Sequence, residues 1–159
     1  MEEKRPFWVR PVAAIASTRP VIAVLKRTIP GIDRWLLRRT RGRMAVTGGL
    51  PTLLLTTTGR KSGEPRSAPL LYLNHGDDWV VIGTNFGGAS HPAWYLNLKA
   101  DPRAELLVEG EKVKVSAREA TEDERSELWS KAMHIYPGYK TYKARVVSRQ
   151  VPMVVLSRA

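Results

Sequence analysis

Two apolar segments separated by a short basic turn constrain the fold of this chain more than any other feature. Leu53-Leu54-Leu55 precedes the turn, and a second apolar run from Ala68 to Leu73 follows it. Between them lies the segment Thr56-Thr57-Thr58-Gly59-Arg60-Lys61-Ser62-Gly63-Glu64-Pro65-Arg66. Two glycines in so short a connection favour a tight turn. The pattern therefore predicts a β-hairpin.

The predicted turn carries three cations, Arg60, Lys61 and Arg66, and the hydroxyl group of Ser62. Positive charges held close to hydroxyl and backbone N–H donors bind phosphate and carboxylate groups. The alternative is a solvated hairpin whose charges only keep the surface soluble. The residues of the turn leave both interpretations open.

Positive charge is concentrated at the N-terminal end. The formal net charge is +11, and eleven of the 26 Lys and Arg residues lie within residues 1–43, against three of the 15 acidic residues. Such a segment suits an anionic surface, either acidic lipid headgroups or nucleic acid. We therefore expect a basic helical segment over residues 1–43 and a second domain over residues 44–159. Phe7, Trp8 and Trp35 would be interfacial anchors, unless the helices only cover one end of the fold.

Several classes of site are excluded or not expected. The chain has no cysteine, which excludes disulfides and thiolate chemistry. His75, His91 and His134 lack metal-ligand spacing, so we expect no metal site. The sequence has neither the dinucleotide-binding glycine motif nor a Walker A motif. No apolar run approaches the roughly 20 residues needed to span a bilayer, and nothing resembles a secretory signal. We expect a cytoplasmic protein.

Short strands and helices are expected along the chain. The predicted strands cover residues 52–58, 67–74, 79–84, 103–109, 112–120 and 153–156, and the predicted helices cover 11–16, 20–27, 32–41, 92–99, 121–134 and 138–147. Thr121 and Glu124 have the spacing of a capping box, and Ser90 is the expected cap of the helix that Pro92 begins. The pattern favours a small closed barrel carrying helices. A parallel crossover over residues 79–109 is the competing interpretation.

Two further groups of residues can line a site. At Pro92 the N-terminal N–H groups of a helix would face the glycine loop over residues 85–91, beside Trp94 and Tyr95. Tyr136, Tyr139 and Tyr142 recur at steps of three, which places the last two on neighbouring parts of one helix face. The alternative for both groups is an ordinary hydrophobic core.

Combined with the basic turn, these groups suit a planar phosphorylated ligand. The residues themselves do not separate a flavin from other planar phosphorylated ligands.

Taken in order, four motifs resemble those of the deazaflavin-dependent nitroreductase family. They are residues 54–66, Asn85-Phe86-Gly87-Gly88, Pro92-Ala93-Trp94-Tyr95-Leu96-Asn97-Leu98 and Tyr136-Pro137-Gly138-Tyr139-Lys140-Thr141-Tyr142. The resemblance implies an α+β, mainly β fold, a split β-barrel of the FMN-binding type with N-terminal and peripheral helices. It also implies coenzyme F420, which carries a phosphate, a lactyl group and a polyglutamate tail.

The resemblance also implies which residues bind. The phosphate and nearby anionic groups would be held by Arg60, Lys61, Ser62 and Arg66. The deazaflavin would be lined by Ser67, Ala68, Pro69, Leu70 and Leu71, and by Gly83, Thr84, Asn85 and Phe86. The start of a helix would close over it through Ala93, Trp94, Tyr95, Leu96 and Asn97. Tyr139 would lie at the boundary of cofactor and substrate, with Tyr136 and Tyr142 on the substrate side.

The implied reaction is hydride transfer from reduced F420 to a planar electrophilic acceptor: a quinone such as menaquinone, an enone or lactone, or a nitroaromatic compound. Tyr136, Tyr139 or Asn85 would hydrogen-bond the developing oxyanion. Asn85 stands where the family's nitro-drug-activating member has serine, so the resemblance extends to cofactor binding but not to nitroimidazole activation. Menaquinone as substrate would agree with peripheral contact between residues 1–43 and the inner, anionic face of the cell membrane.

Two other functions remain as alternatives. One is an FMN-dependent split-barrel oxidoreductase, and the other is a basic nucleic-acid-binding domain without enzymatic activity. Most of the charge lies outside the part of the chain that carries the motifs, and no nucleic-acid-binding motif is present, so we expect no nucleic-acid partner. The oligomeric state, monomer or homodimer, is left open.

Overall fold

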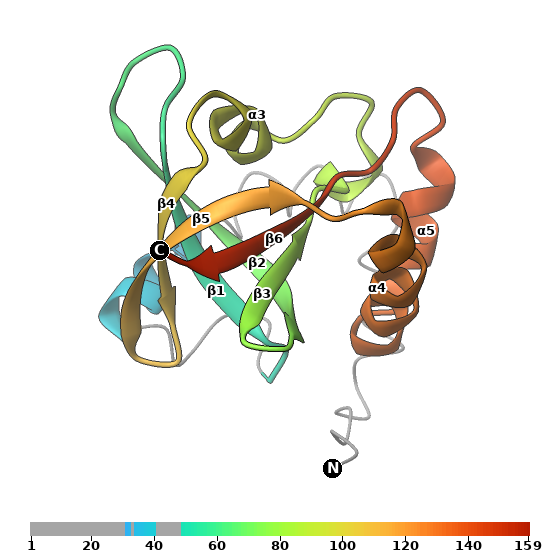
Figure 1. Ribbon diagram of the computed structural model, residues 1–159, viewed down its shortest axis with the longest axis horizontal. Coiled ribbons are helices and arrows are strands. Elements are labelled where there is room, and N and C mark those ends of the chain that lie inside the picture. Colours follow the sequence, from blue (N-terminus) through green and yellow to red (C-terminus); the bar gives the residue numbers. More distant parts are fainter. Residues whose placement is uncertain (1–30, 33, 41–48) are drawn as a thin grey trace.

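A computed structural model describes residues 31–32, 34–40 and 49–159 (Figure 1). Six strands form a closed barrel in the order β1-β2-β3-β6-β5-β4. Every neighbouring pair is antiparallel. The strands are β1 (Thr52–Thr58), β2 (Pro65–His75), β3 (Asp78–Ile82), β4 (Arg103–Val108), β5 (Glu111–Glu119) and β6 (Met153–Arg158). The predicted barrel is confirmed. The parallel crossover is wrong, because the strands on either side of its helix are not neighbours.

Three helices and a short 3-10 turn accompany these strands. They are η1 (Asn85–Gly87), α3 (Ala93–Ala100), α4 (Glu122–Ile135) and α5 (Gly138–Arg145). A further helix covers residues 31–32 and 34–39, where the sequence predicts one. The helices predicted over 11–16 and 20–27, and most of the basic segment, lie outside the described residues. In the described part, no helix has both the length and the apolar character needed to cross a membrane.

Strand alternation produces two hydrophobic clusters. Along β6, Val154 and Leu156 point to a cluster inside the barrel, whereas Met153 and Val155 point to a cluster beneath α4 and α5. Successive side chains of a strand face opposite sides of the sheet. Because both sides of β6 are covered, its sequence is continuously apolar instead of alternating.

The helices are placed on different parts of the barrel. Figure 1 shows α4 and α5 side by side against its wall, while α3 lies over one end, next to the projecting β1–β2 turn. The predicted capping box begins α4: the Thr121 hydroxyl accepts from the Glu124 backbone N–H, and the Glu124 carboxylate accepts from the Thr121 N–H. These bonds satisfy two N–H groups that a helix start otherwise leaves unpaired.

Several details differ from expectation. Strand β3 ends at Ile82, two residues earlier than predicted, and β6 continues to Arg158, two residues later. Strand β2 begins two residues earlier than predicted, because Pro65 is still in register with Thr58 of β1. Helix α5 ends at Arg145, two residues earlier than predicted. Ser90 does not cap α3: the cap position belongs to Pro92, which has no side-chain hydrogen bond, and the Ser90 carbonyl instead accepts from the Asn85 amide.

Candidate active site

The β1–β2 turn, residues 59–64, is closed tightly by backbone hydrogen bonds. The Gly59 N–H donates to the Glu64 carbonyl at 2.8 Å, and the Gly63 N–H donates to the Gly59 carbonyl at 2.7 Å. Gly63 has φ +71°, a conformation that glycine adopts without steric cost. A Cβ on Gly59 would stand 2.8 Å from the Ser62 Oγ. The tight turn leaves the cationic side chains of Arg60 and Lys61 exposed, and that of Arg66 is exposed at the start of β2.

Asn97 of α3 holds this basic turn against the barrel. Its Oδ1 accepts from the backbone N–H of Arg60 at 3.1 Å, and its Nδ2 donates to the Thr57 hydroxyl at 3.0 Å. The side chain is only 4% exposed. The resemblance implies that Asn97 binds the cofactor, but its amide is engaged by the hairpin. Asn97 is therefore placed to position the turn.

The remaining residues of α3 divide between core and surface. Trp94 and Tyr95 are buried in the barrel cluster, Leu96 packs against it, and Ala93 is exposed. The Tyr95 phenol donates to the Glu119 carboxylate. Burial, followed by this hydrogen bond, raises the pKa of Tyr95 to about 12. Of the helix residues named for closing over the cofactor, only Ala93 at its first turn is exposed.

The first half of β2 joins the hairpin to the helix over residues 31–39. The Ser67 hydroxyl lies 2.9 Å from the Thr56 hydroxyl and accepts from the Arg38 guanidinium at 3.2 Å. The other residues named for the deazaflavin wall on β2 are half-buried: Ala68, Pro69, Leu70 and Leu71. This part of β2 is thus only partly covered by the described structure.

The 83–88 loop has an unusual backbone. Asn85, Phe86 and Gly87 have φ values of 48°, 55° and 78°, so three consecutive residues are left-handed. Each left-handed non-glycine residue costs about 1–3 kcal/mol and persists only where its surroundings hold it, often at functional sites. The Asn85 amide secures the loop by donating to the Ser90 carbonyl at 3.0 Å. Thr84, in the same loop, is buried.

The three tyrosines form one cluster, as their spacing predicts. The Tyr136 ring lies 5.6 Å from the Tyr139 ring and 6.1 Å from the Tyr142 ring, centre to centre. The Tyr136 and Tyr142 hydroxyl oxygens are 3.4 Å apart. A Cβ on Gly138 would overlap the Tyr136 ring, so the glycine lets that ring fold back over the start of α5. The cluster reaches the 83–88 loop, because Phe86 packs edge-on against Tyr142 at 5.9 Å.

Burial differs among these phenols. Tyr139 and Tyr142 are 6% and 4% exposed, whereas Tyr136 is half-buried. Desolvation is the main cause that raises the pKa of Tyr139 and of Tyr142, with smaller contributions from neighbouring tyrosines. Both phenols therefore stay protonated at neutral pH and can donate a hydrogen bond.

One residue of this end of the molecule is missing from the sequence-based prediction. Arg149, between α5 and β6, donates hydrogen bonds to three backbone carbonyls of the 83–88 loop. An isolated arginine in a polar segment has no spacing or motif that could have indicated this role. The basic turn contacts α3 through Asn97, Arg149 joins the start of α3 to the 83–88 loop, and the loop lies on α5. In Figure 1 the basic turn and α3 lie at one end of the barrel, whereas α5 lies against its wall.

Comparison with known proteins gives a family match and similar solved structures. Residues 32–158 match the F420H(2)-dependent quinone reductase family. An F420H(2)-dependent quinone reductase of Mycobacterium tuberculosis is 34% identical over 128 residues, which cover 77% of this chain and 85% of that protein.

Two solved structures are similar as well. An F420-H2 dependent reductase, FDR-A, superposes with a TM-score of 0.61 and 31% identity, covering 67% of this chain and 94% of that chain. A protein described as a domain-swapped dimer superposes with a TM-score of 0.64 and 28% identity, covering 87% of this chain and 99% of that chain. The matches favour the deazaflavin assignment over an FMN enzyme or a nucleic-acid-binding domain. The chain belongs to the F420H(2)-dependent quinone reductase family.

Proposed function

We propose that this F420H2-dependent reductase holds the phosphate end of its cofactor on the basic turn and reduces a quinone beside the tyrosine cluster. The observation that carries the proposal is the clamp by Asn97 in the second turn of α3, which fixes the turn that exposes Arg60 and Lys61, with Arg66 exposed at the start of β2. Surface cations on a mobile loop would repel one another and gain little from a bound anion. Here the backbone position is fixed before the ligand binds, which lowers the entropic cost of binding.

The donor set fits the coenzyme. Phosphate and carboxylate groups match the guanidinium groups of Arg60 and Arg66 and the ammonium group of Lys61. The Ser62 hydroxyl already accepts from the Arg66 guanidinium at 3.4 Å, which keeps the two side chains on the same side of the turn. When bound, reduced F420 supplies a hydride from a ring carbon and acts as a two-electron donor.

The acceptor end is assigned to the tyrosines. Tyr136 is the half-buried member of the cluster, and its phenol lies beside that of Tyr142. In this position Tyr136 donates a hydrogen bond to the carbonyl oxygen of a quinone, which becomes negatively charged as hydride arrives. Tyr139 and Tyr142 orient that phenol. Asn85 keeps the 83–88 loop in place through Ser90, so its contribution to the oxyanion is secondary.

Charge removal at the turn tests this assignment. In Arg60→Gln/Lys61→Gln, F420 affinity should fall by about tenfold to a hundredfold, because two charge-assisted contacts are lost. The thermal unfolding temperature should change little, since both side chains are exposed and the Arg60 guanidinium makes a long contact of 3.5 Å with the Asn97 Oδ1. Lys114→Gln, an exposed lysine on β5, is the matched control and should bind F420 as the wild type does. Equal affinity in the double variant and the control would remove the turn from the site.

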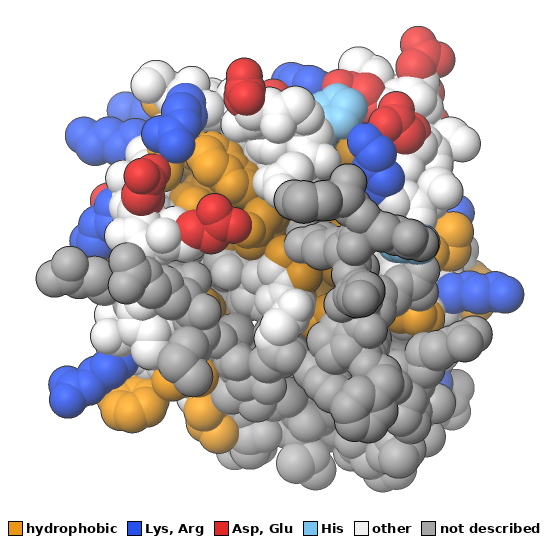
Figure 2. All heavy atoms as spheres, turned by 90° about the horizontal axis from the view of Figure 1, so that it is seen from below, with side chains coloured by type: hydrophobic (Ala, Val, Ile, Leu, Met, Phe, Trp, Pro, Cys, Tyr) orange, Lys and Arg blue, Asp and Glu red, His pale blue; other side chains and the backbone are white. Residues whose placement is uncertain are grey.

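We further propose that the helix over residues 31–39 touches an anionic membrane. Trp35 and Ile32 are 63% and 53% exposed, and Arg34, Arg38 and Arg39 line a hollow together with Trp35. An exposed indole among arginines is typical of peripheral helices at lipid interfaces. From below, Figure 2 shows hydrophobic side chains next to Lys and Arg on the described surface. The alternative is that this helix, whose Leu37 is fully buried, only covers the barrel.

A vesicle-pelleting assay distinguishes membrane contact from a helix that only covers the barrel. Full-length protein should pellet with vesicles of anionic phospholipid and not with zwitterionic ones, and Trp35→Ala should reduce the bound fraction severalfold. Val147→Ser is the control, because Val147 is 91% exposed but belongs to the segment after α5. Equal pelleting of Trp35→Ala and wild type, or no pelleting of the wild type, would contradict membrane contact through this helix.

A further inference from the structure

We propose that Arg149 is a positioning residue for the cofactor: it holds the 83–88 loop through three of its backbone carbonyls, so that F420 affinity depends on Arg149 without contact between the two. The inference rests on the proposed function, in which this loop lines the deazaflavin. It concerns a residue that belongs to none of the motifs discussed above.

The guanidinium group of Arg149 donates hydrogen bonds to backbone carbonyls at both ends of the loop. Its Nη1 donates to the Gly83 carbonyl at 3.1 Å, and its Nη2 donates to the carbonyls of Thr84 at 3.0 Å and Gly88 at 3.2 Å. Gly83 and Gly88 are the first and last residues of the loop. One rigid, planar group therefore fixes the separation of the two ends, which a flexible ammonium group cannot do.

The surroundings of Arg149 make its guanidinium depend on the loop carbonyls as hydrogen-bond partners. Desolvation lowers the pKa of Arg149, and its Nε is buried without a hydrogen-bond partner among the described residues. In the same part of the chain no carboxylate forms a salt bridge with it. The positive charge is balanced by carbonyl dipoles of the loop, and a buried charge without such partners is costly. The loop and the guanidinium therefore stabilise each other.

Helix α5 confines the loop from another direction. A Cβ on Gly87 would stand 3.0 Å from the Arg145 Cβ, so the loop backbone lies directly on the helix. The left-handed residues Asn85 and Phe86 need such support, because their backbone conformation is not favourable in isolation. Without the Arg149 contacts the loop would keep the helix side, the Asn85–Ser90 hydrogen bond, the Gly83 N–H bond to the Pro152 carbonyl and its own internal turn hydrogen bonds, but it would lose the group that joins its two ends.

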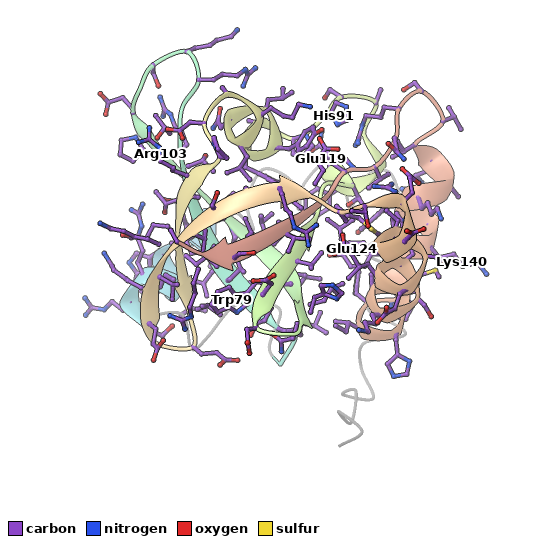
Figure 3. All side chains as sticks on the ribbon, in the orientation of Figure 1. Trp79, His91, Arg103, Glu119, Glu124 and Lys140 are labelled. Atoms are coloured by element: carbon purple, nitrogen blue, oxygen red, sulfur yellow. The ribbon has the colours of Figure 1, made fainter. Side chains whose placement is uncertain are left out.

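Arg149 also connects the loop with the start of α3. Its Nη1 lies 3.4 Å from the His91 Nδ1, and the His91 ring packs against Tyr95 at 4.9 Å. The Tyr95 phenol in turn donates to Glu119. Figure 3 shows His91 and Glu119 near each other at one end of α3. A single side chain thus reaches two of the segments proposed to surround the deazaflavin.

The test compares Arg149→Lys with Arg125→Lys. Arg125 is the matched control: it is also an arginine that donates to a backbone carbonyl, that of Val151 at 2.9 Å, but it does not touch the loop. Quenching of tryptophan fluorescence on F420 addition gives affinity, and thermal unfolding gives stability. Arg149→Lys should bind F420 at least about tenfold more weakly. Arg125→Lys should bind within about twofold of the wild type at a comparable loss of stability.

Two readouts separate positioning from a general loss of structure. Without cofactor, the Gly87 and Gly88 amides, which donate to Thr84 and Asn85 carbonyls at 2.9 and 3.0 Å, should exchange faster with solvent in Arg149→Lys but not in Arg125→Lys. In Arg149→Ala, added methylguanidinium should recover part of the F420 affinity.

The outcomes are distinguishable. Arg149→Lys with wild-type F420 affinity overturns the inference, even if the basic-turn variant binds weakly and the proposed function stands. Equal loss of affinity in Arg149→Lys and Arg125→Lys also overturns it, because stability alone would then explain the effect. A wild type that binds no F420 refutes the proposed site and this inference together.

Discussion

Tyr136, Tyr139 and Tyr142 differ in what a substrate can reach. Tyr139 packs against the Trp129 ring at 6.5 Å and is buried, and Tyr142 is buried beside Phe86. Tyr136 is the most accessible phenol, and the Tyr142 hydroxyl at 3.4 Å restricts its rotation. An oriented donor stabilises a developing oxyanion better than water does, because it needs no reorganisation during the reaction.

Tyr136→Phe should therefore affect chemistry more than cofactor binding. Turnover with a quinone acceptor should fall by about tenfold to a hundredfold, since one hydrogen-bond donor to the oxyanion is lost. F420 affinity should stay within about twofold. Tyr139→Phe should lower turnover in the same direction. Steady-state kinetics and fluorescence titration measure the two effects, with Tyr72→Phe as control, because its phenol donates to Glu109 in the β4–β5 turn. Unchanged turnover in both variants would remove the tyrosines from the mechanism.

At this scale the sequence predicts which residues are chemically suited to a site, but not which are free to act. The cations of the basic turn and the tyrosine cluster were predictable from composition and spacing. The engagement of Asn97 by Arg60 and Thr57 was not, because these partners lie 37 and 40 residues away. Arg149 and Gly83 are 66 residues apart. Only the barrel topology brings such pairs together.

Among the elements, α4 begins at a cluster of charged and titratable side chains, Glu124, Arg118 and His75, which is called the junction here. Glu124 closes the capping box and receives the Arg118 guanidinium of β5 through two hydrogen bonds of 2.8 and 2.9 Å. His75 of β2 lies 3.4 Å from the same carboxylate. The Arg118 hydrogen bond, followed by the Thr121 backbone N–H, holds the pKa of Glu124 well below its usual range. The junction fastens the helix to two strands.

This junction predicts sensitivity to acid. A carboxylate with a lowered folded-state pKa contributes stability above its unfolded-state pKa of about 4.3, and that contribution is lost as pH falls toward the folded-state value. The denaturation midpoint of the wild type should therefore drop more below about pH 4.3 than that of Glu124→Gln. Glu111→Gln removes an exposed pair with Arg158 and is the control. Parallel pH curves for wild type and Glu124→Gln would contradict this role.

Most elements were predictable because their signals are local. The limits of β1 follow from an apolar run that ends at a glycine-containing turn, and the capping box of α4 follows from a four-residue motif. The Ser90 cap was wrong for a non-local reason, because Ser90 is held by Asn85 inside the left-handed loop. A sequence pattern does not indicate that two consecutive non-glycine residues adopt positive φ.

For the molecule as a whole, the proposed site lies where the two hydrophobic clusters meet. Helix α3 belongs to the barrel cluster through Trp94 and Leu98, and it carries the basic turn through Asn97. The tyrosines belong to the cluster beneath α4 and α5. The 83–88 loop connects them, because it follows β3 and packs Phe86 against the tyrosine side. Closure of the barrel by the β1–β4 pair holds both halves in one geometry.

We expect this geometry to bind F420 in preference to FMN. The most direct measurement is titration of the full-length protein with F420 and, separately, with FMN, followed by intrinsic tryptophan fluorescence. The account predicts selective F420 binding with a Kd in roughly the micromolar range, typical of cofactor and substrate sites. Binding of FMN alone would contradict the cofactor assignment while keeping the fold, and binding of neither would contradict the proposed site as a whole.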